Sequence, residues 1–120
     1  MATTVIAVVA VFFAGMGVYA LAAPAQLIAP FDISLGSAAA RSEVRAVYGG
    51  FGVAIAVVLG VALAVPDLRA GIVTTVAAAL AGMAGGRVFS ALDGRTGFYP
   101  NWFYCIVETV AAAALFVVLL

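Results

Sequence analysis

The sequence predicts an all-α fold, a bundle of four transmembrane helices with a short interfacial segment between the first two. Of the 120 residues, 68% are hydrophobic and only 8% are charged, whereas a soluble domain carries about 25% charged residues. Such a chain lacks the charge to cover a globule in water and needs lipid as its solvent. Crossing the hydrocarbon core takes about 20 residues per helix, so four helices with short connections account for the chain. We therefore expect residues 1–120 to form a single integral membrane domain.

The first helix is expected at residues 3–23, which carry no charge. Pro24 ends it, because proline lacks the N–H group that a helix interior needs. The small residues near its end resemble a signal-peptide cleavage site, but no Lys or Arg precedes the apolar run, so we interpret it as a transmembrane helix. Residues 24–36 mix prolines and Asp32 with large apolar side chains. They are too short and too broken to span, and we expect them to lie along the membrane interface.

The second helix is expected at residues 38–65, where Ser37 supplies an N-cap. It is longer than a span requires, which places its first turns in the headgroup region. The connection at 66–69 is so short that the third helix, at 70–92, should be its antiparallel neighbour. The remaining elements are a Gly-rich turn at 93–97 and a fourth helix at 102–120.

Charged and aromatic residues gather on one side of this predicted bundle. Eight of the ten charged residues belong to the first and third connections or to the adjoining helix ends: Asp32, Arg41, Glu43, Arg45, Arg87, Asp93, Arg95 and Glu108. An aromatic belt typical of a membrane interface lies on the same side: Phe98, Tyr99, Trp102, Phe103 and Tyr104. Because arginines favour the cytoplasmic side, we expect this side to face the cytoplasm, with both termini outside.

Small residues recur at every fourth position of the second and third helices. The stripes include Gly52 and Gly60 in the second helix, and Gly82 and Gly86 in the third. Apolar side chains give helices no net drive to associate in lipid, so close backbone contact at small residues takes over that role. We interpret the stripes mainly as packing of the four helices within one chain. A homo-oligomer interface is the alternative.

Three ionisable residues, Arg45, Arg87 and Glu108, fall inside or at the mouth of predicted spans. A charge at the bilayer centre costs at least about 2.5–3.5 kcal/mol on insertion scales, so such residues are usually paired. Arg87 lies six residues before Asp93, and Glu108 six residues after Trp102, which places both about 9 Å from the helix ends. We expect Glu108 to pair with Arg87 or Arg45. Supporting polar residues at this level are Arg41, Tyr48, Ser90 and Asp93.

The polar cluster of Arg45, Arg87 and Glu108 could have any of three roles. It can fix the register of the helices, because buried ion pairs specify geometry without adding stability. An excess arginine can bind an anionic group such as a lipid headgroup, a carboxylate or a phosphate. Glu108 can take part in proton-coupled transport, the weakest of the three. We assign Cys105, one helical turn before Glu108, to packing.

Several function classes are disfavoured by composition. The chain has no His and one Cys, so we expect no metal site and no cofactor. Its net charge of zero argues against nucleic acid as a partner. No catalytic motif is present, which makes an enzyme the less favoured interpretation without deciding the question.

Four motifs resemble one known family. The run Arg-Ala-Val-Tyr-Gly-Gly at 45–50, Gly-Arg-Val-Phe-Ser at 86–90, Asp93-Gly94 and the lone Glu108 are similar to the bacterial membrane family catalogued as domain of unknown function 4345. The resemblance covers nearly the whole chain. It implies a four-helix, multi-pass protein of the bacterial inner membrane and transfers no activity. It also makes Arg45, Arg87, Asp93 and Glu108 the strongest functional candidates.

The favoured function is that of a small integral membrane accessory or structural protein. It would bind a larger membrane complex or an anionic lipid through the polar cluster near one face. The alternative is a small homo-oligomeric transporter, although the first helix lacks the acidic residue that four-helix multidrug exporters carry there. The expected partners are the lipid bilayer and either a larger complex or further copies of the chain.

Overall fold

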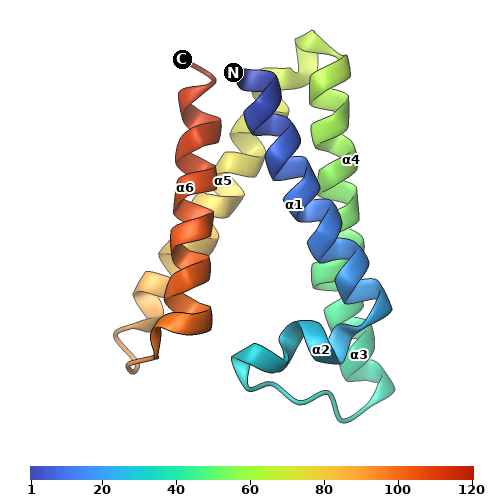
Figure 1. The fold of residues 1–120 in the computed structure, drawn as a ribbon, viewed down its shortest axis with the longest axis vertical. Coiled ribbons are helices and arrows are strands. Elements are labelled where there is room, and N and C mark those ends of the chain that lie inside the picture. The colour runs from blue at the N-terminus through green and yellow to red at the C-terminus, as the bar shows by residue number, and fades with distance from the viewer.

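The computed structural model describes all residues from 1 to 120, and it contains helices but no strands (Figure 1). Four helical stretches are long and apolar enough to cross a membrane: Ala2–Ala22, Ala38–Ala64, Pro66–Ser90 and Phe98–Val117. The predicted fold class is therefore confirmed. The regular helices are α1 (Ala2–Ala22), α2 (Pro24–Ile28), α3 (Ala38–Val44), α4 (Phe51–Ala64), α5 (Pro66–Ser90) and α6 (Phe103–Val117).

Local sequence signals explain most of the helix ends. Ser37 caps α3, since the backbone N–H of Ala40 donates to Ser37 Oγ at 3.1 Å. Helix α5 begins about one turn before the predicted start, because Pro66 occupies its first turn, where a missing N–H costs nothing. Between α2 and α3, a 3₁₀ turn at Ala29–Phe31 ends at Asp32, which has left-handed backbone angles (φ 61°, ψ 37°) that aspartate tolerates better than most residues.

Two irregular segments, one π-helical and one kinked, interrupt the spans near the charged end of the protein. One, at Arg45–Gly50, joins α3 to α4 in a continuous helix. The other, at Phe98–Trp102, is a kink that leads into α6, because Tyr99 has an extended conformation (φ −99°, ψ 135°). π-Helical segments often occur at functional sites, and each of the two segments contributes a tyrosine to the cavity between the helices, Tyr48 and Tyr99.

The helices form two antiparallel pairs rather than a bundle closed along its whole length. Helix α1 packs along α4, a pair named the first arm, and α5 packs along α6, the second arm. The arms meet near the chain termini and diverge toward the opposite end, which α2 crosses (Figure 1). The hydrophobic core lies where the arms meet and consists of Ile6, Val9, Phe13, Leu59, Ala62, Val73, Val76, Ala77, Leu80, Ala112 and Leu115.

Glycines bring the backbones of α1 and α4 into contact. A Cβ atom on Gly17 would lie 2.6 Å from the backbone nitrogen of Val53, and one on Gly52 would lie 3.0 Å from Gly17 Cα. A Cβ atom on Gly49 would lie 2.8 Å from the end of the Leu21 side chain, a contact that movement of this side chain relieves more easily than a backbone contact. Only glycine permits this crossing. The small-residue stripe predicts Gly52 as a packing residue, whereas no sequence pattern singles out Gly17.

The other three predicted packing glycines face outward. A Cβ atom on Gly60, Gly82 or Gly86 would meet nothing within 4 Å, and all three residues are exposed. Our interpretation of them as contacts within the chain was wrong. The second arm is held instead by larger side chains on the opposite face of α5, among them Val73 and Leu80, which are buried.

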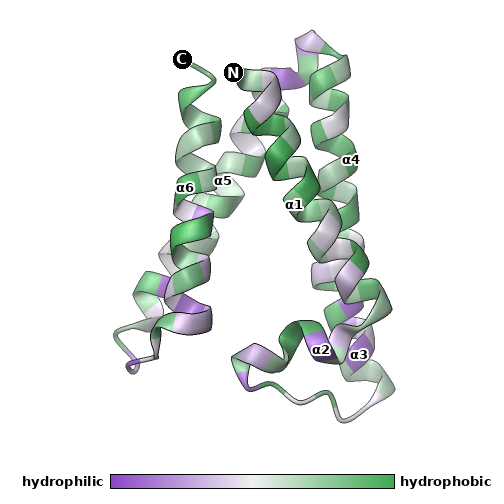
Figure 2. Ribbon diagram, in the orientation of Figure 1, coloured by the Kyte–Doolittle hydropathy of each residue, from purple (hydrophilic) through white to green (hydrophobic).

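Hydrophilic residues concentrate at the divergent end of the two arms (Figure 2). At the opposite end, the side chain of Arg69 caps the C-terminus of α4. Its Nε–H donates to the carbonyl of Ala62 at 2.8 Å, and its Nη2 donates to that of Leu63 at 3.2 Å. These bonds satisfy carbonyls that the end of a helix leaves without partners.

Candidate functional site

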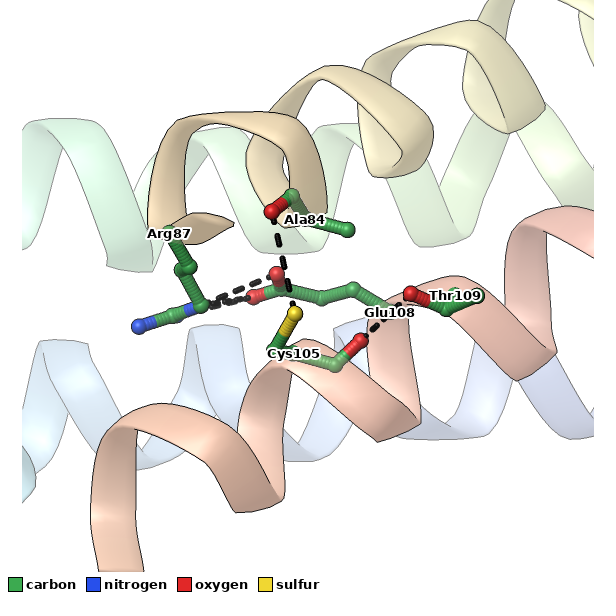
Figure 3. Close-up of polar contacts among 5 residues, drawn as sticks. All are labelled: Ala84, Arg87, Cys105, Glu108 and Thr109. Atoms are coloured by element: carbon green, nitrogen blue, oxygen red, sulfur yellow. Dashed lines mark hydrogen bonds and ion pairs between the residues drawn. The ribbon is translucent and has the colours of Figure 1, made fainter. Parts of the chain in front are cut away.

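An ion pair joins α5 to α6 within the second arm (Figure 3). Arg87 Nη2 donates to Glu108 Oε1 at 2.8 Å, and Arg87 Nε donates to Oε2 at 2.9 Å. The Glu108 side chain is 4% exposed and that of Arg87 is 22% exposed. This is the paired arrangement that the sequence predicts for Glu108. Its two parallel bonds are the strong form of an arginine–carboxylate contact.

The pair lies close to the ends of both helices. Arg87 is three residues before the end of α5 at Ser90, and Glu108 is five residues after the start of α6 at Phe103. At 1.5 Å per residue these separations are about 5 Å and about 8 Å. Beside the pair, Cys105 Sγ donates to the carbonyl of Ala84 at 3.7 Å, and Thr109 Oγ1 donates to that of Cys105 at 2.7 Å (Figure 3). These neighbours tie α6 to α5 and to itself.

Two aromatic rings flank the guanidinium group of Arg87. Its Cζ atom lies 5.7 Å from the ring centre of Phe31 and 5.8 Å from that of Tyr104. The two rings are themselves 5.7 Å apart. Phe31 belongs to the segment after α2, so it links the first arm to the ion pair of the second. Cation–π contacts of this kind stabilise an arginine that is partly removed from water.

Arg45 does not belong to the ion pair, contrary to our expectation of one cluster that holds all three charged residues. Its Nε–H donates to the carbonyl of Leu21 at 3.0 Å, at the C-terminal end of α1. Arg45 therefore lies on the first arm while Glu108 lies on the second, and the two arms diverge at this level (Figure 1). Equal depth in the membrane does not bring two residues together when their helices belong to separate arms.

The supporting polar residues are scattered. Arg41 is exposed on α3, and Ser90 and Asp93 are exposed where α5 ends. None of these three side chains makes a hydrogen bond to the rest of the protein. Tyr48, from the π-helical segment, is half-buried and is the one that contributes to the cavity.

A cavity of about 470 Å³ lies between the two arms. This volume is within the range of ligand pockets, about 300–1,000 Å³. The polar residues of its lining are Gln26, Tyr19, Tyr48, Tyr99, Tyr104, Arg87 and Glu108. The apolar residues include Val11, Phe12, Phe13, Met16, Leu80 and Met83. Both arms and the segment after α2 thus contribute to one site.

The family described as "Domain of unknown function (DUF4345)" matches residues 1–119, which include every residue of the cavity. The chain belongs to this family. No curated protein and no solved structure matches the chain. The family resemblance predicted from the motifs is thereby confirmed, and the DUF4345 assignment leaves the activity to be argued from the site.

The cavity of this DUF4345 protein has unused hydrogen-bonding groups at its polar end. The hydroxyl groups of Tyr19 and Tyr48 make no hydrogen bond to the protein, and Arg87 Nη1 donates to no protein atom, because only its Nε and Nη2 face Glu108. Toward the middle of α1 the lining becomes apolar. Sequence reasoning missed Phe31 and Met83, since an isolated apolar residue in a hydrophobic chain gives no signal of a cavity.

Proposed function

We propose that this protein is a non-enzymatic accessory protein of the bacterial inner membrane that binds one amphiphilic lipid molecule between its two arms. The observation that supports this proposal is the cavity, with an ion pair and tyrosines at one end and apolar walls at the other. A lipid has the same division, with a polar head at the membrane surface and a hydrocarbon tail toward the bilayer centre.

The polar end of the cavity suits a head group because its donors are already positioned. Arg87 is held by Glu108 and by the rings of Phe31 and Tyr104, so its free Nη1 is fixed in place. A ligand then gains a hydrogen bond without the entropy loss of ordering the side chain that donates it.

The apolar end suits a tail because of its length and composition. Along α1 the apolar part of the lining runs from Val11 to Met16, a distance of about 8 Å at 1.5 Å per residue. Phe12, Met16 and Met83 belong to this wall, and methionine adapts readily to ligands of irregular shape. Thirteen of the 18 lining residues are hydrophobic when the four tyrosines are counted with the aliphatic, methionine and phenylalanine side chains, so a tail would meet a largely apolar surface on both arms.

The test compares two glycine substitutions that differ only in the direction they face. Gly15 lines the cavity, Gly60 faces outward, and a Cβ atom on either meets nothing within 4 Å. Gly15→Phe should therefore fill the cavity without disturbing the fold, while Gly60→Phe is the matched control. Native mass spectrometry would count the endogenous lipids that stay bound to each purified protein.

Wild type and Gly60→Phe should each retain one lipid molecule, and Gly15→Phe should retain none. Equal retention by all three proteins would contradict the proposal, as would an absence of bound lipid from wild type. Circular dichroism of each variant would establish that the helices are intact, so that a loss of lipid reports on the cavity.

A homo-oligomeric transporter is the second candidate, and the outward-facing glycines of α5 favour it. Gly82 and Gly86 are exposed with open space before them, which is the form of surface that lets helices of two chains approach closely. Gly86→Leu should then give a folded protein of smaller assembly size, with Gly60→Leu as the control. An unchanged size for Gly86→Leu would count against this candidate.

A further inference from the structure

The charged residues that line the cavity indicate which kind of head group the proposed lipid ligand carries. We infer that the head group is uncharged and carries an acceptor oxygen, as in an alcohol or a carbonyl compound. This inference rests on the proposed lipid-binding function and specifies its ligand class. It replaces the anionic headgroup that the sequence suggested, because that suggestion required an arginine in excess of the ion pair.

The cavity contains no excess positive charge. Its only charged residues are Arg87 and Glu108, and these neutralise each other through a two-bond contact. Arg45, an arginine without an acidic partner, donates to Leu21 and does not line the cavity. An anionic head group would lose its hydration on entry and find no net countercharge, which makes its burial costly.

Within the ion pair, only one edge of the Arg87 guanidinium group remains accessible to a ligand. Glu108 is almost completely buried, whereas Arg87 is partly exposed and has Nη1 free. A ligand therefore meets an N–H donor at this point, and the cavity lining also carries the hydroxyl groups of Tyr19 and Tyr48, which make no hydrogen bond to the protein. A hydroxyl or carbonyl oxygen accepts from such donors. A cationic amine has no lone pair to offer and would be repelled by the guanidinium group.

The test uses three probes that share one tail and differ in the charge of the head: oleyl alcohol, oleyl sulfate and oleylamine. A photoactivatable octadecanol with a diazirine in its chain would label the detergent-purified protein, and peptide mass spectrometry would locate the label. Each probe then competes with the label. Oleyl alcohol should displace it from wild type at a concentration about tenfold lower than either charged probe, which corresponds to about 1.4 kcal/mol.

Variants that change the charge of the cavity should reverse and then restore the preference for the uncharged probe. Glu108→Gln leaves Arg87 without a countercharge, so oleyl sulfate should become the best competitor. The double variant Arg87→Gln/Glu108→Gln restores a neutral cavity, so the preference for the uncharged head over the charged ones should return. If Glu108→Gln does not fold, the three probes on wild type and on the double variant still test whether the cavity prefers an uncharged head group.

Two failures can be told apart. If oleyl sulfate or oleylamine competes as well as oleyl alcohol on wild type, the uncharged-head inference is overturned while lipid binding in the cavity stands. If the label does not reach cavity residues in wild type more than in Gly15→Phe, the proposed function itself is wrong. If wild type prefers oleyl alcohol and Glu108→Gln prefers oleyl sulfate, the result supports both lipid binding in the cavity and the uncharged head group.

Discussion

Removing Glu108 tests whether the Arg87–Glu108 pair holds the second arm together. Glu108→Gln takes away the countercharge of Arg87 and leaves the guanidinium group between Phe31 and Tyr104. Breaking a fully buried pair by removing one partner costs about 3–5 kcal/mol. Arg87 is 22% exposed and lies within one turn of a helix end, where headgroup water reaches it. We therefore expect Glu108→Gln to lower the free energy of unfolding by about 2–3 kcal/mol.

The partner variant and the double variant complete a thermodynamic cycle. Arg87→Met should cost a similar amount, because it leaves a carboxylate that is 4% exposed without its donor. The double variant Arg87→Met/Glu108→Gln removes both charges and should cost less than the sum of the single variants by about 2 kcal/mol, within the range of measured couplings between contacting residues.

The assay is reversible unfolding in mixed micelles, followed by circular dichroism as the fraction of denaturing detergent rises. Glu43→Gln is the matched control, because Glu43 is exposed on α3 and forms no salt bridge, and its effect should be within about 0.5 kcal/mol of zero. If Glu108→Gln costs no more than this control, the ion pair does not stabilise the second arm. The same conclusion follows if the effects of Arg87→Met and Glu108→Gln on the free energy of unfolding simply add in the double variant.

Three further predictions concern other contacts. Gly17→Leu should prevent folding or cost more than about 3 kcal/mol, because its side chain would enter the backbone of α4, while Gly60→Leu in the same micelle assay should be tolerated. Phe31→Ala should leave the ion pair intact but lower stability by about 1–2 kcal/mol, and no loss would argue against the aromatic contact. Arg45→Gln should lower the free energy of unfolding by about 1 kcal/mol, because Arg45 loses its hydrogen bond to the end of α1. This loss should add to that of Glu108→Gln, and a coupling between the two substitutions would instead indicate that Arg45 and Glu108 belong to one cluster.

The elements of the fold could be predicted because they depend on local signals. Four apolar stretches of span length, a proline at the end of the first, and Ser37 before the second are visible in the chain, and the helices follow them closely. The ion pair could also be anticipated. Arg87 and Glu108 lie at matching depths on consecutive helices joined by a short turn, so their side chains were expected at the same level.

The arrangement of the two arms could not be predicted in this way. Gly17 and Gly52 let α1 and α4 cross closely, while the core of large side chains joins the arms at one end only. These contacts tilt the arms apart at the other end (Figure 1). That divergence separates Arg45 from Glu108 and leaves room for the cavity.

Three features follow from the residues of each segment alone: which segments are apolar enough to cross the membrane, on which side the charges gather, and the need of Glu108 for an arginine partner. Each result is a consequence of the cost of placing a polar or charged group in hydrocarbon, a cost that acts on one segment at a time. Three others emerge only from the packing of the helices: which arginine is the partner, which glycines are buried and where the cavity lies. These depend on the angles between helices, which are set by many small packing contacts across all four and have no single residue as their signal.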